Sequence, residues 1–274
     1  AEQAPAPGGR LPPTRSRRDA KMPVVTIAAE GAVRTVTLNR PEKRNAMDSQ
    51  MLQELAAAFE VTPLAEERVT VIRANGTVFC AGLDLKERGE GGPMRGASPI
   101  EHVLDLIEHY PLPVVGVVQG DAIAGGNELA LHCDLVVAST EARFGMSLAQ
   151  IGLAPTWFLA KKLLEVGGPV AAREILLLGD PIPAERMHAL GLIARAAPPD
   201  GLELTAQAMI ERLAANAPLS LRAMKALLVR EMAFRDEIAH ADVDALVDAA
   251  RTSADAREGM AARLEKRAPR FEGR

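Results

Sequence analysis

The chain has 274 residues, of which 48% are hydrophobic and 25% are charged, a composition typical of an ordinary globular protein. Its formal net charge of −4 and its aromatic content of 3% argue against a nucleic-acid-binding surface. No apolar run reaches the roughly 18 residues that a membrane-spanning helix needs, so we expect no membrane partner. The two cysteines, Cys80 and Cys133, show neither a disulfide framework nor the spacing of zinc ligands. We therefore expect no metal site, and a reducing, cytoplasmic location.

The N-terminal residues 1–22 combine prolines, adjacent glycines and a cluster of arginines without any hydrophobic periodicity. This composition predicts a disordered N-terminal extension. An incidental extension and a transit peptide both fit it, although the segment lacks the amphipathic face of a transit peptide.

From residue 24 onward, short β-branched runs alternate with longer amphipathic patterns. In chain order, these first predict a hairpin of residues 24–28 and 33–38, a helix over 51–59 capped by Asp48 or Ser49, and a strand over 69–73. A mobile loop over 86–98 and a helix over 100–109 follow. The pattern then predicts a strand over 114–118, a helix that begins at Gly125 and Gly126, and a strand over 135–138. This alternation predicts an α/β core with a parallel sheet, within residues 23–200.

After about residue 158 the pattern becomes almost entirely helical. Helices are predicted over residues 160–166, 171–178, 202–216, 220–240 and 253–266. We therefore expect residues 201–274 to form a helical C-terminal region attached to the core.

The segment from Val114 to Asp134 carries the strongest chemical signal, because a buried strand leads through Gly120 to Gly125 and Gly126 at the start of a helix. Unpaired N–H groups at a helix N-terminus suit an oxyanion, and glycine lets a ligand approach them closely. Glu128 follows by one turn and can face the same ligand, which predicts an enolate-forming site. The alternatives are a glycine pair that serves strand–helix packing and a glutamate placed by the helix dipole. His132, four residues after Glu128, is interpreted as a packed or exposed side chain rather than a base.

A second segment, residues 77–86, ends a strand with an Ala-Gly turn. The amide of Leu83, directly after Gly82, is a candidate for a second oxyanion donor. A simple turn in which Asp84 caps the next helix explains the same pattern.

Taken together, these segments resemble the enoyl-CoA hydratase/isomerase (crotonase) superfamily over roughly residues 24–271. Four stretches carry the resemblance in order: 38–47 resembles the first signature, 79–86 and 120–128 resemble the two oxyanion loops, and 253–271 resembles the C-terminal helix and tail. The resemblance implies a crotonase-like spiral of ββα turns with a helical C-terminal region that makes oligomer contacts. It also implies a homotrimer or a dimer of trimers.

The resemblance further implies roles for individual residues. The amides of Leu83 and Gly125 would hold a thioester oxygen, and Glu128 would take the place of the first catalytic glutamate. Lys266 and Phe271 match positions that reach the CoA of a neighbouring subunit. The full set of implied substrate-binding positions is Arg44, Ala46, Ala81, Asp84, Leu85, Gly126, Leu148, Thr156, Trp157, Lys266 and Phe271. The partner would be an acyl-CoA thioester, and no separate cofactor is expected because coenzyme A is part of the substrate.

The chain departs from the family pattern at Leu148, where hydratases carry a second glutamate, and at Thr156 and Trp157, which replace a glycine-rich stretch. Hydration needs one group to activate water and another to protonate carbon, so a single carboxylate must do both or another residue must enter. We expect an enolate-stabilising enzyme, an enoyl-CoA hydratase or hydratase-like lyase of fatty acid metabolism. The alternatives are an isomerase, a malonyl-type decarboxylase that uses Glu128 alone, and a non-catalytic CoA-binding paralogue.

Overall fold

The computed structural model describes residues 22–85, 87 and 98–274 of the chain. Residues 1–21 of the predicted N-terminal extension and nearly all of the predicted loop over residues 86–98 therefore lie outside the described residues.

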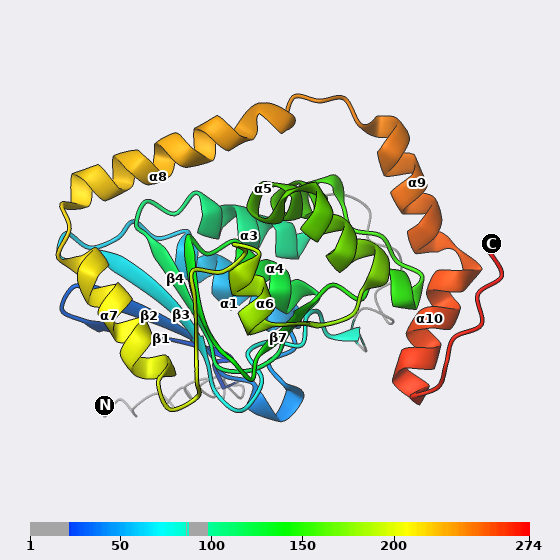
Figure 1. Cartoon of the computed structure of the whole chain (residues 1–274), viewed down its shortest axis with the longest axis horizontal. Helices are drawn as coiled ribbons and strands as arrows, with labels where there is room; N and C mark the ends of the chain where they lie inside the picture. Colours follow the sequence, from blue (N-terminus) through cyan, green and yellow to red (C-terminus); the bar gives the residue numbers. More distant parts are fainter. Residues whose placement is uncertain (1–21, 86, 88–97) are drawn as a thin grey trace, which may run out of the picture.

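A six-stranded sheet forms the centre of the protein (Figure 1), in the order β1-β2-β3-β4-β6-β9. Only the β1–β2 hairpin is antiparallel, and all other neighbours in this sheet are parallel. The strands are β1 (Val25–Glu30), β2 (Val33–Leu38), β3 (Val69–Ala74), β4 (Val114–Val118), β6 (Leu135–Ser139) and β9 (Arg195–Ala197). The first five confirm the predicted strands to within two residues at each end. The three residues of β9 are too short to leave a periodic signal.

Alternation along the central strands directs side chains to two different layers. Val115 and Val117 of β4 pack with Leu202, Ala206 and Ile210 of α7 (Leu202–Ala214) on one face of the sheet. On the other face, the larger core cluster joins the sheet to the remaining core helices. These are α1 (Ser49–Phe59), α3 (Pro99–Glu108), α4 (Gly125–Leu131), α5 (Trp157–Arg173) and α6 (Ala184–Ala189).

A side-chain cap marks the start of α1, as the sequence predicts. Asp48 caps α1, because its carboxylate accepts a hydrogen bond of 2.9 Å from the amide of Met51.

Within α5 the backbone leaves the helical region at Gly168, with φ +66°, and Pro169 follows. Proline disfavours the helical conformation of the residue before it, which explains this break. The break matches the prediction of two separate helices, over residues 160–166 and 171–178, and the second continues as a π-helical turn, η3 (Glu174–Leu178).

A small second sheet lies beside the start of α4. It consists of β5 (Ala122–Ile123), β7 (Arg143–Gly145) and β8 (Ile182–Pro183), with β7 in the middle. The amide of Ala124, directly after β5, donates to the carbonyl of Gly145 at 2.7 Å. This sheet therefore holds the turn that leads into α4.

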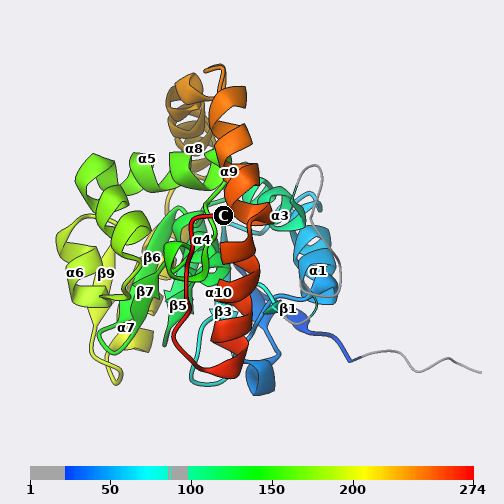
Figure 2. The ribbon, with the colours of Figure 1, turned by 90° about the vertical axis from the view of Figure 1, so that its right-hand side faces the viewer.

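The C-terminal helices form an arm along the edge of the core. In Figures 1 and 2, α8 (Pro218–Met232) lies above the core, and α9 (Ala241–Thr252) and α10 (Ala254–Glu265) run down one side. The predicted single helix over residues 220–240 was too long, since α8 ends at Met232 and a 3-10 turn, η4 (Ala233–Arg235), follows. No glycine or proline marks this end, and α9 was not predicted. The predicted domain boundary after residue 200 stays a prediction.

One lysine anchors α8 to the core. Lys225 is the only buried residue of α8, and its Nζ donates to the carbonyls of Ile107 (3.1 Å) and Leu112 (3.2 Å) and to the carboxylate of Asp134 (2.7 Å). The rest of this helix touches the core little. Several of its large apolar side chains are exposed, namely Leu219, Met224, Leu227 and Leu228.

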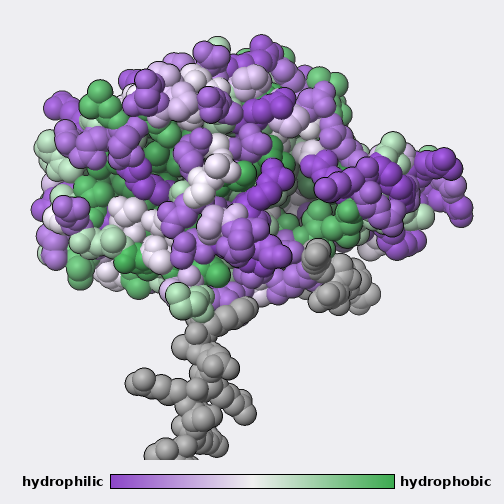
Figure 3. Space-filling model, turned by 90° about the horizontal axis from the view of Figure 1, so that it is seen from below, coloured by the Kyte–Doolittle hydropathy of each residue, from purple (hydrophilic) through white to green (hydrophobic). Residues whose placement is uncertain are grey.

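On the face seen in Figure 3, hydrophobic side chains occur in small groups between hydrophilic ones. Across the ranges that the structure covers, no helix combines the length and the apolar character needed to cross a membrane.

Candidate active site

The start of α4 presents a backbone amide that the helix itself does not use. Ala124 has φ +50° and ψ −118°, a sparsely populated conformation for a residue with a side chain. Its carbonyl accepts a hydrogen bond from the amide of Glu128 at 3.1 Å, so the adjoining N–H of Gly125 points the opposite way, out of the helix N-terminus. No described residue accepts a hydrogen bond from this N–H, which leaves it available to an oxyanion.

The segment around Leu83 offers a second amide of this kind. Met47 and Leu83 form a parallel bridge, in which the amide of Met47 donates to the Gly82 carbonyl (2.8 Å) and the amide of Asp84 donates to the Met47 carbonyl (2.9 Å). In such a bridge the N–H of Leu83 points to the side away from Met47. Gly82 supplies the turn with φ +91°, a conformation that glycine adopts without strain, and the half-buried Leu85 follows.

The two loops are in direct contact, and glycines make the contact possible. A Cβ built on Gly82 would lie 3.2 Å from the amide nitrogen of Gly125 and 2.9 Å from the carbonyl oxygen of Ile123. A Cβ on Gly126 would lie 2.1 Å from the carbonyl oxygen of Cys80, a clash that no side chain can relieve. The unused amides of Leu83 and Gly125 therefore belong to adjoining loops. Their role as an oxyanion hole stays a prediction.

A buried thiol lies at the base of the first loop. The Sγ of Cys80 donates to the carbonyl of Asn45 at 3.1 Å and accepts a long hydrogen bond from the amide of Gly82 at 3.5 Å. Burial raises the pKa of Cys80 to about 12, so this cysteine is a packed thiol rather than a nucleophile.

Glu128 lies one helical turn beyond the amide of Gly125, with its side chain completely buried. Neither carboxylate oxygen has a hydrogen-bond partner within the described ranges. Burial raises the pKa of Glu128 to about 8; the positive charge of Lys162 opposes this shift, and the negative charge of Glu101 adds to it. At neutral pH the carboxyl group is therefore mostly protonated and ready to donate a proton.

His132 is a packed neighbour of Glu128 and not a base, in agreement with the interpretation of the sequence. Its Nδ1 donates to the backbone carbonyl of Glu128 at 2.7 Å, and its ring stacks on Phe158 with centroids 5.2 Å apart. Burial lowers the pKa of His132 to about 3, with Lys162 adding to the effect, so the imidazole stays neutral.

Beyond His132 lies a charge cluster that the sequence analysis missed. The Nζ of Lys162 is 2.9 Å from Glu108 and 3.7 Å from Glu165, and the Nζ of Lys161 is 2.5 Å from Asp236. Burial raises the pKa of Glu108, but the pairing with Lys162 outweighs it and the net pKa is lowered. Lys161, Lys162 and Glu165 share α5, whereas Glu108 comes from α3 and Asp236 follows η4, so no local spacing signals the contacts with Glu108 and Asp236.

Three of the implied substrate-binding positions, Leu148, Thr156 and Trp157, lie on the connection into α5 and at its start. Leu148 is half-buried and packs against both the main core and the small cluster of Ile151 and Leu153. The hydroxyl of Thr156 caps α5, and Trp157 stacks on His240 at the start of α9, with ring centroids 4.4 Å apart. Their contact with an acyl chain stays a prediction.

Several of the implied substrate-binding positions come together near the first loop. The amide of Ala81 donates to the carbonyl of Arg44 at 3.0 Å. Arg40, which the sequence analysis missed, donates from its guanidinium to the carbonyl of Ala46 and to the carboxylate of Asp84, both at 2.9 Å. Arg40 thus joins the segment of the first signature to the first oxyanion loop. Its position directly before a proline gave no functional signal.

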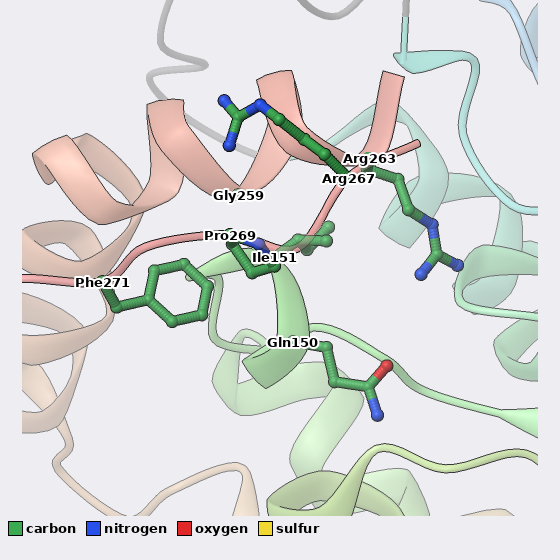
Figure 4. Close-up of a pocket in the computed structure, with 7 residues that line it drawn as sticks. All are labelled: Gln150, Ile151, Gly259, Arg263, Arg267, Pro269 and Phe271. Atoms are coloured by element: carbon green, nitrogen blue, oxygen red, sulfur yellow. The ribbon is translucent and has the colours of Figure 1, made fainter. Parts of the chain in front are cut away.

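Lys266 and Phe271 lie elsewhere, on the C-terminal arm. Lys266 ends α10 with φ +56° and is exposed. Phe271 is 44% exposed and lines a surface pocket of about 410 Å³ (Figure 4). The other residues around this pocket are Gln150, Ile151, Gly259, Arg263, Arg267 and Pro269. No described contact joins Lys266 or Phe271 to Glu128 of the same chain, and their reach to a neighbouring subunit stays a prediction.

The fold and the contact between the two loops fit the family that the sequence resembles, the enoyl-CoA hydratases and isomerases. Comparison with known proteins supports the same family. The family model described as enoyl-CoA hydratase/isomerase matches residues 28–274. A putative enoyl-CoA hydratase of Thermus thermophilus is 37% identical over 252 residues, which cover 88% of this chain and 98% of that protein.

Solved structures agree with the sequence comparison. A methylmalonyl-CoA decarboxylase complexed with 2S-carboxypropyl-CoA superposes with a TM-score of 0.85 at 25% identity, covering 92% of this chain and 98% of its own. An enoyl-CoA hydratase of Mycobacterium avium subsp. paratuberculosis superposes with a TM-score of 0.78 at 26% identity, covering 91% and 98%. The chain belongs to the enoyl-CoA hydratase/isomerase family. The predicted family, its crotonase-like α/β fold and an enzyme of this family are thereby confirmed.

Proposed function

We propose that this protein converts acyl-CoA thioesters by stabilising a thioester enolate. The amides of Leu83 and Gly125 hold the thioester oxygen, and Glu128 transfers the proton at the adjacent carbon. One observation carries this proposal: two loops with unused amides are in contact, one helical turn before a fully buried carboxyl group that has no hydrogen-bond partner among the described residues. Donors of this kind, aimed at developing negative charge, supply the largest single share of catalysis in many enzymes.

Hydration of an enoyl-CoA is the first candidate reaction. Relatives at this level of identity are named enoyl-CoA hydratases, and the protonated Glu128 is suited to deliver a proton to carbon. We assign the activity to fatty acid metabolism and to the cytoplasm, and the two buried, free thiols support a reducing compartment. The reaction uses no separate cofactor, because the two amides and the carboxyl group provide the charge stabilisation and the proton.

Decarboxylation of a malonyl-type thioester is the second candidate. It needs an oxyanion hole and a dry pocket but only one proton donor. Leu148 in place of a second carboxylate and the resemblance to a methylmalonyl-CoA decarboxylase favour it.

For the assembly, we propose a homotrimer or a dimer of trimers. Helix α9 has no buried residue within one chain, and α8 exposes Leu219, Leu227 and Leu228. Such apolar faces are typical of surfaces that pack against another subunit. In the assembly, Lys266 and Phe271 of one chain reach the CoA bound by the next.

A panel of CoA esters tests these reactions, with the products read by mass spectrometry. Hydration adds one water, decarboxylation removes carbon dioxide, and isomerisation, which leaves the mass unchanged, is resolved by chromatography. A chain that binds the esters and changes none of them is a non-catalytic paralogue, which would refute the proposal.

The variant Glu128→Gln tests the role of the carboxyl group. We expect it to lose at least about 100-fold in turnover because proton transfer is removed, while the Kd for the CoA ester stays close to that of the wild type. Unchanged turnover would refute the role of Glu128. Titration calorimetry with the same ester separates loss of chemistry from loss of binding.

A further inference from the structure

The protein has a second carboxylate close to the candidate site, and it comes from an unexpected element. Glu101 lies in the first turn of α3, directly after Ile100. Ile100 packs against the oxyanion loop, since a Cβ built on Gly125 would lie 2.7 Å from its Cδ1. Glu101 is thus on α3 and Glu128 on α4, so the two carboxyl groups come from different helices.

Thr156 holds this carboxylate in place. Its Oγ1 accepts a long hydrogen bond of 3.4 Å from the amide of Leu159, so its own proton is free to be donated elsewhere. That proton goes to Oε1 of Glu101, at 2.5 Å. Oε2 of Glu101 receives no hydrogen bond from the described residues, and it remains available to another donor, such as water.

The charge of Glu101 also affects the pKa of Glu128. Burial is the main reason for the raised pKa of Glu128, and the negative charge of Glu101 raises it further. Burial and the nearby charge of Glu101 thus act in the same direction on Glu128, and unlike environments of two carboxyl groups are what divides them into an acid and a base.

We propose that Glu101, positioned by Thr156, is the second acid–base group of the hydration reaction, in place of the carboxylate that Leu148 replaces. This inference rests on the proposed function, and it identifies the group that acts on water.

The addition of water involves two proton transfers, one to Glu101 and one from Glu128. The carboxylate of Glu101 takes a proton from water, and the water oxygen forms a bond to C3 of the enoyl thioester. The π electrons of the C2–C3 bond move to the thioester oxygen, where the amides of Leu83 and Gly125 stabilise the enolate. The enolate then collapses as C2 takes the proton of Glu128. Glu101 releases its proton to solvent and Glu128 takes one up, which restores both groups.

Two reactions separate the roles of the carboxylates. Hydration of crotonyl-CoA needs both groups, whereas exchange of the C2 protons of butyryl-CoA with D₂O needs the two amides and Glu128 only. In Glu101→Gln we expect crotonyl-CoA hydration to fall by at least about 100-fold, while butyryl-CoA exchange stays within about threefold of wild type. Glu128→Gln is expected to lose both reactions. Asp105→Asn, an exposed position on the same helix, serves as the control and should leave both unchanged.

Rescue provides an independent readout. Adding Leu148→Glu to Glu101→Gln returns a carboxylate to the site, and we expect it to recover at least about tenfold of the lost hydration. Thr156→Ser, which keeps the hydroxyl, is expected to retain more hydration than Thr156→Val.

Several results would overturn the assignment. Hydration by Glu101→Gln at the wild-type rate would do so, and so would a parallel loss of hydration and exchange, which indicates a structural role. Wild-type exchange without any hydration would reject Glu101 as a hydration base and leave enolate formation standing. Absence of exchange in the wild type would instead refute the proposed function itself.

Discussion

At the scale of single residues, the main feature is the fully buried carboxyl group of Glu128, which has no hydrogen-bond partner among the described residues. An ionised carboxylate in this position would lose its solvation, so the protein keeps Glu128 protonated to a pH far above the ordinary value of 4.5. The neighbouring His132 stays neutral for the same reason and adds no charge to the site. Burial thus selects which form of Glu128 meets the substrate.

The pH dependence of the reaction follows from this. The pKa of Glu128 is raised to about 8, so the acid form persists below that pH and is lost above it. We expect kcat/KM for crotonyl-CoA hydration to fall as the pH rises through about 8, and exchange of the C2 protons of butyryl-CoA, which needs the base form, to rise over the same range. Rate profiles between pH 6 and 10 measure this. Two profiles that move in the same direction would contradict the assignment of Glu128 as the group that titrates.

Gly82 tests the arrangement of the two loops. A methyl group there would lie 2.9 Å from the carbonyl oxygen of Ile123, and φ of +91° disfavours any side chain. We expect Gly82→Ala to displace the loop and to lower C2 exchange by about 100-fold, the cost of losing one oxyanion donor. Gly201→Ala, where a Cβ meets only ordinary contacts of 3.4 Å or more at a negative φ, is the matched control. Equal exchange rates for both variants would show that the loop contact does not matter.

At the scale of elements, the connection between core and arm is narrow. Lys225 provides the only buried side chain of α8 and binds two carbonyls and Asp134. Asp134 also accepts from the amide of Val114 at 2.7 Å, so the same carboxylate joins the arm to the start of the central strand β4.

Removal of this lysine is therefore expected to release α8. We expect Lys225→Met to lower the free energy of unfolding by about 2–3 kcal/mol, because Asp134 and two carbonyls lose a charged donor. Urea unfolding gives the energy, and hydrogen exchange of residues 218–232 localises it. Arg230→Met, at an exposed position on the same helix, should change neither. Protection of α8 that is unchanged in Lys225→Met would show that other contacts hold the arm.

The elements of the core were predictable because each carries its own local signal. Strands such as β4, which has four valines in five residues, are rich in β-branched residues, and the break within α5 is marked by Gly168 and Pro169. The end of α8 carries no such mark, and β9 is only three residues long. The prediction therefore failed where a strand was too short, or where no glycine or proline marked the end of a helix.

The candidate site was predictable only in part, for a similar reason. Glycines and Glu128 stand in one short segment, so their spacing is visible in the sequence. Glu101 lies 55 residues before Thr156, and a glutamate beside a buried isoleucine on an amphipathic helix is ordinarily a solvated charge. The contact that gives it a role exists only after α3 and α5 pack together.

At the scale of the whole molecule, the arm leaves apolar surface unpaired. Exposed residues of α8 and α9 include Leu227, Leu228 and Leu246. A stable interface between subunits buries on the order of 1,600 Å² in total, and these exposed side chains can contribute to such an area.

Oligomer size tests this surface. We expect light scattering to give three or six copies of the chain, and the pair of substitutions Leu227→Asp and Leu228→Asp to shift the population toward single chains because buried charge opposes association. Leu204→Asp, at a leucine of α7 that is even more exposed, serves as the control. A wild-type protein that is monomeric at micromolar concentration would contradict the proposed assembly.

The sulfur atom of Cys80 offers a way to time the motions of this enzyme. It lies beneath the first loop, bonded to the carbonyl of Asn45, and it ionises only at high pH. A disulfide reagent such as Ellman's reagent can reach it only after the loop lifts away. In a chain that carries Cys133→Ser, the rate at which Cys80 is labelled therefore measures how often the loop opens. Slower labelling in the presence of a CoA ester would show that the bound ligand keeps the loop closed.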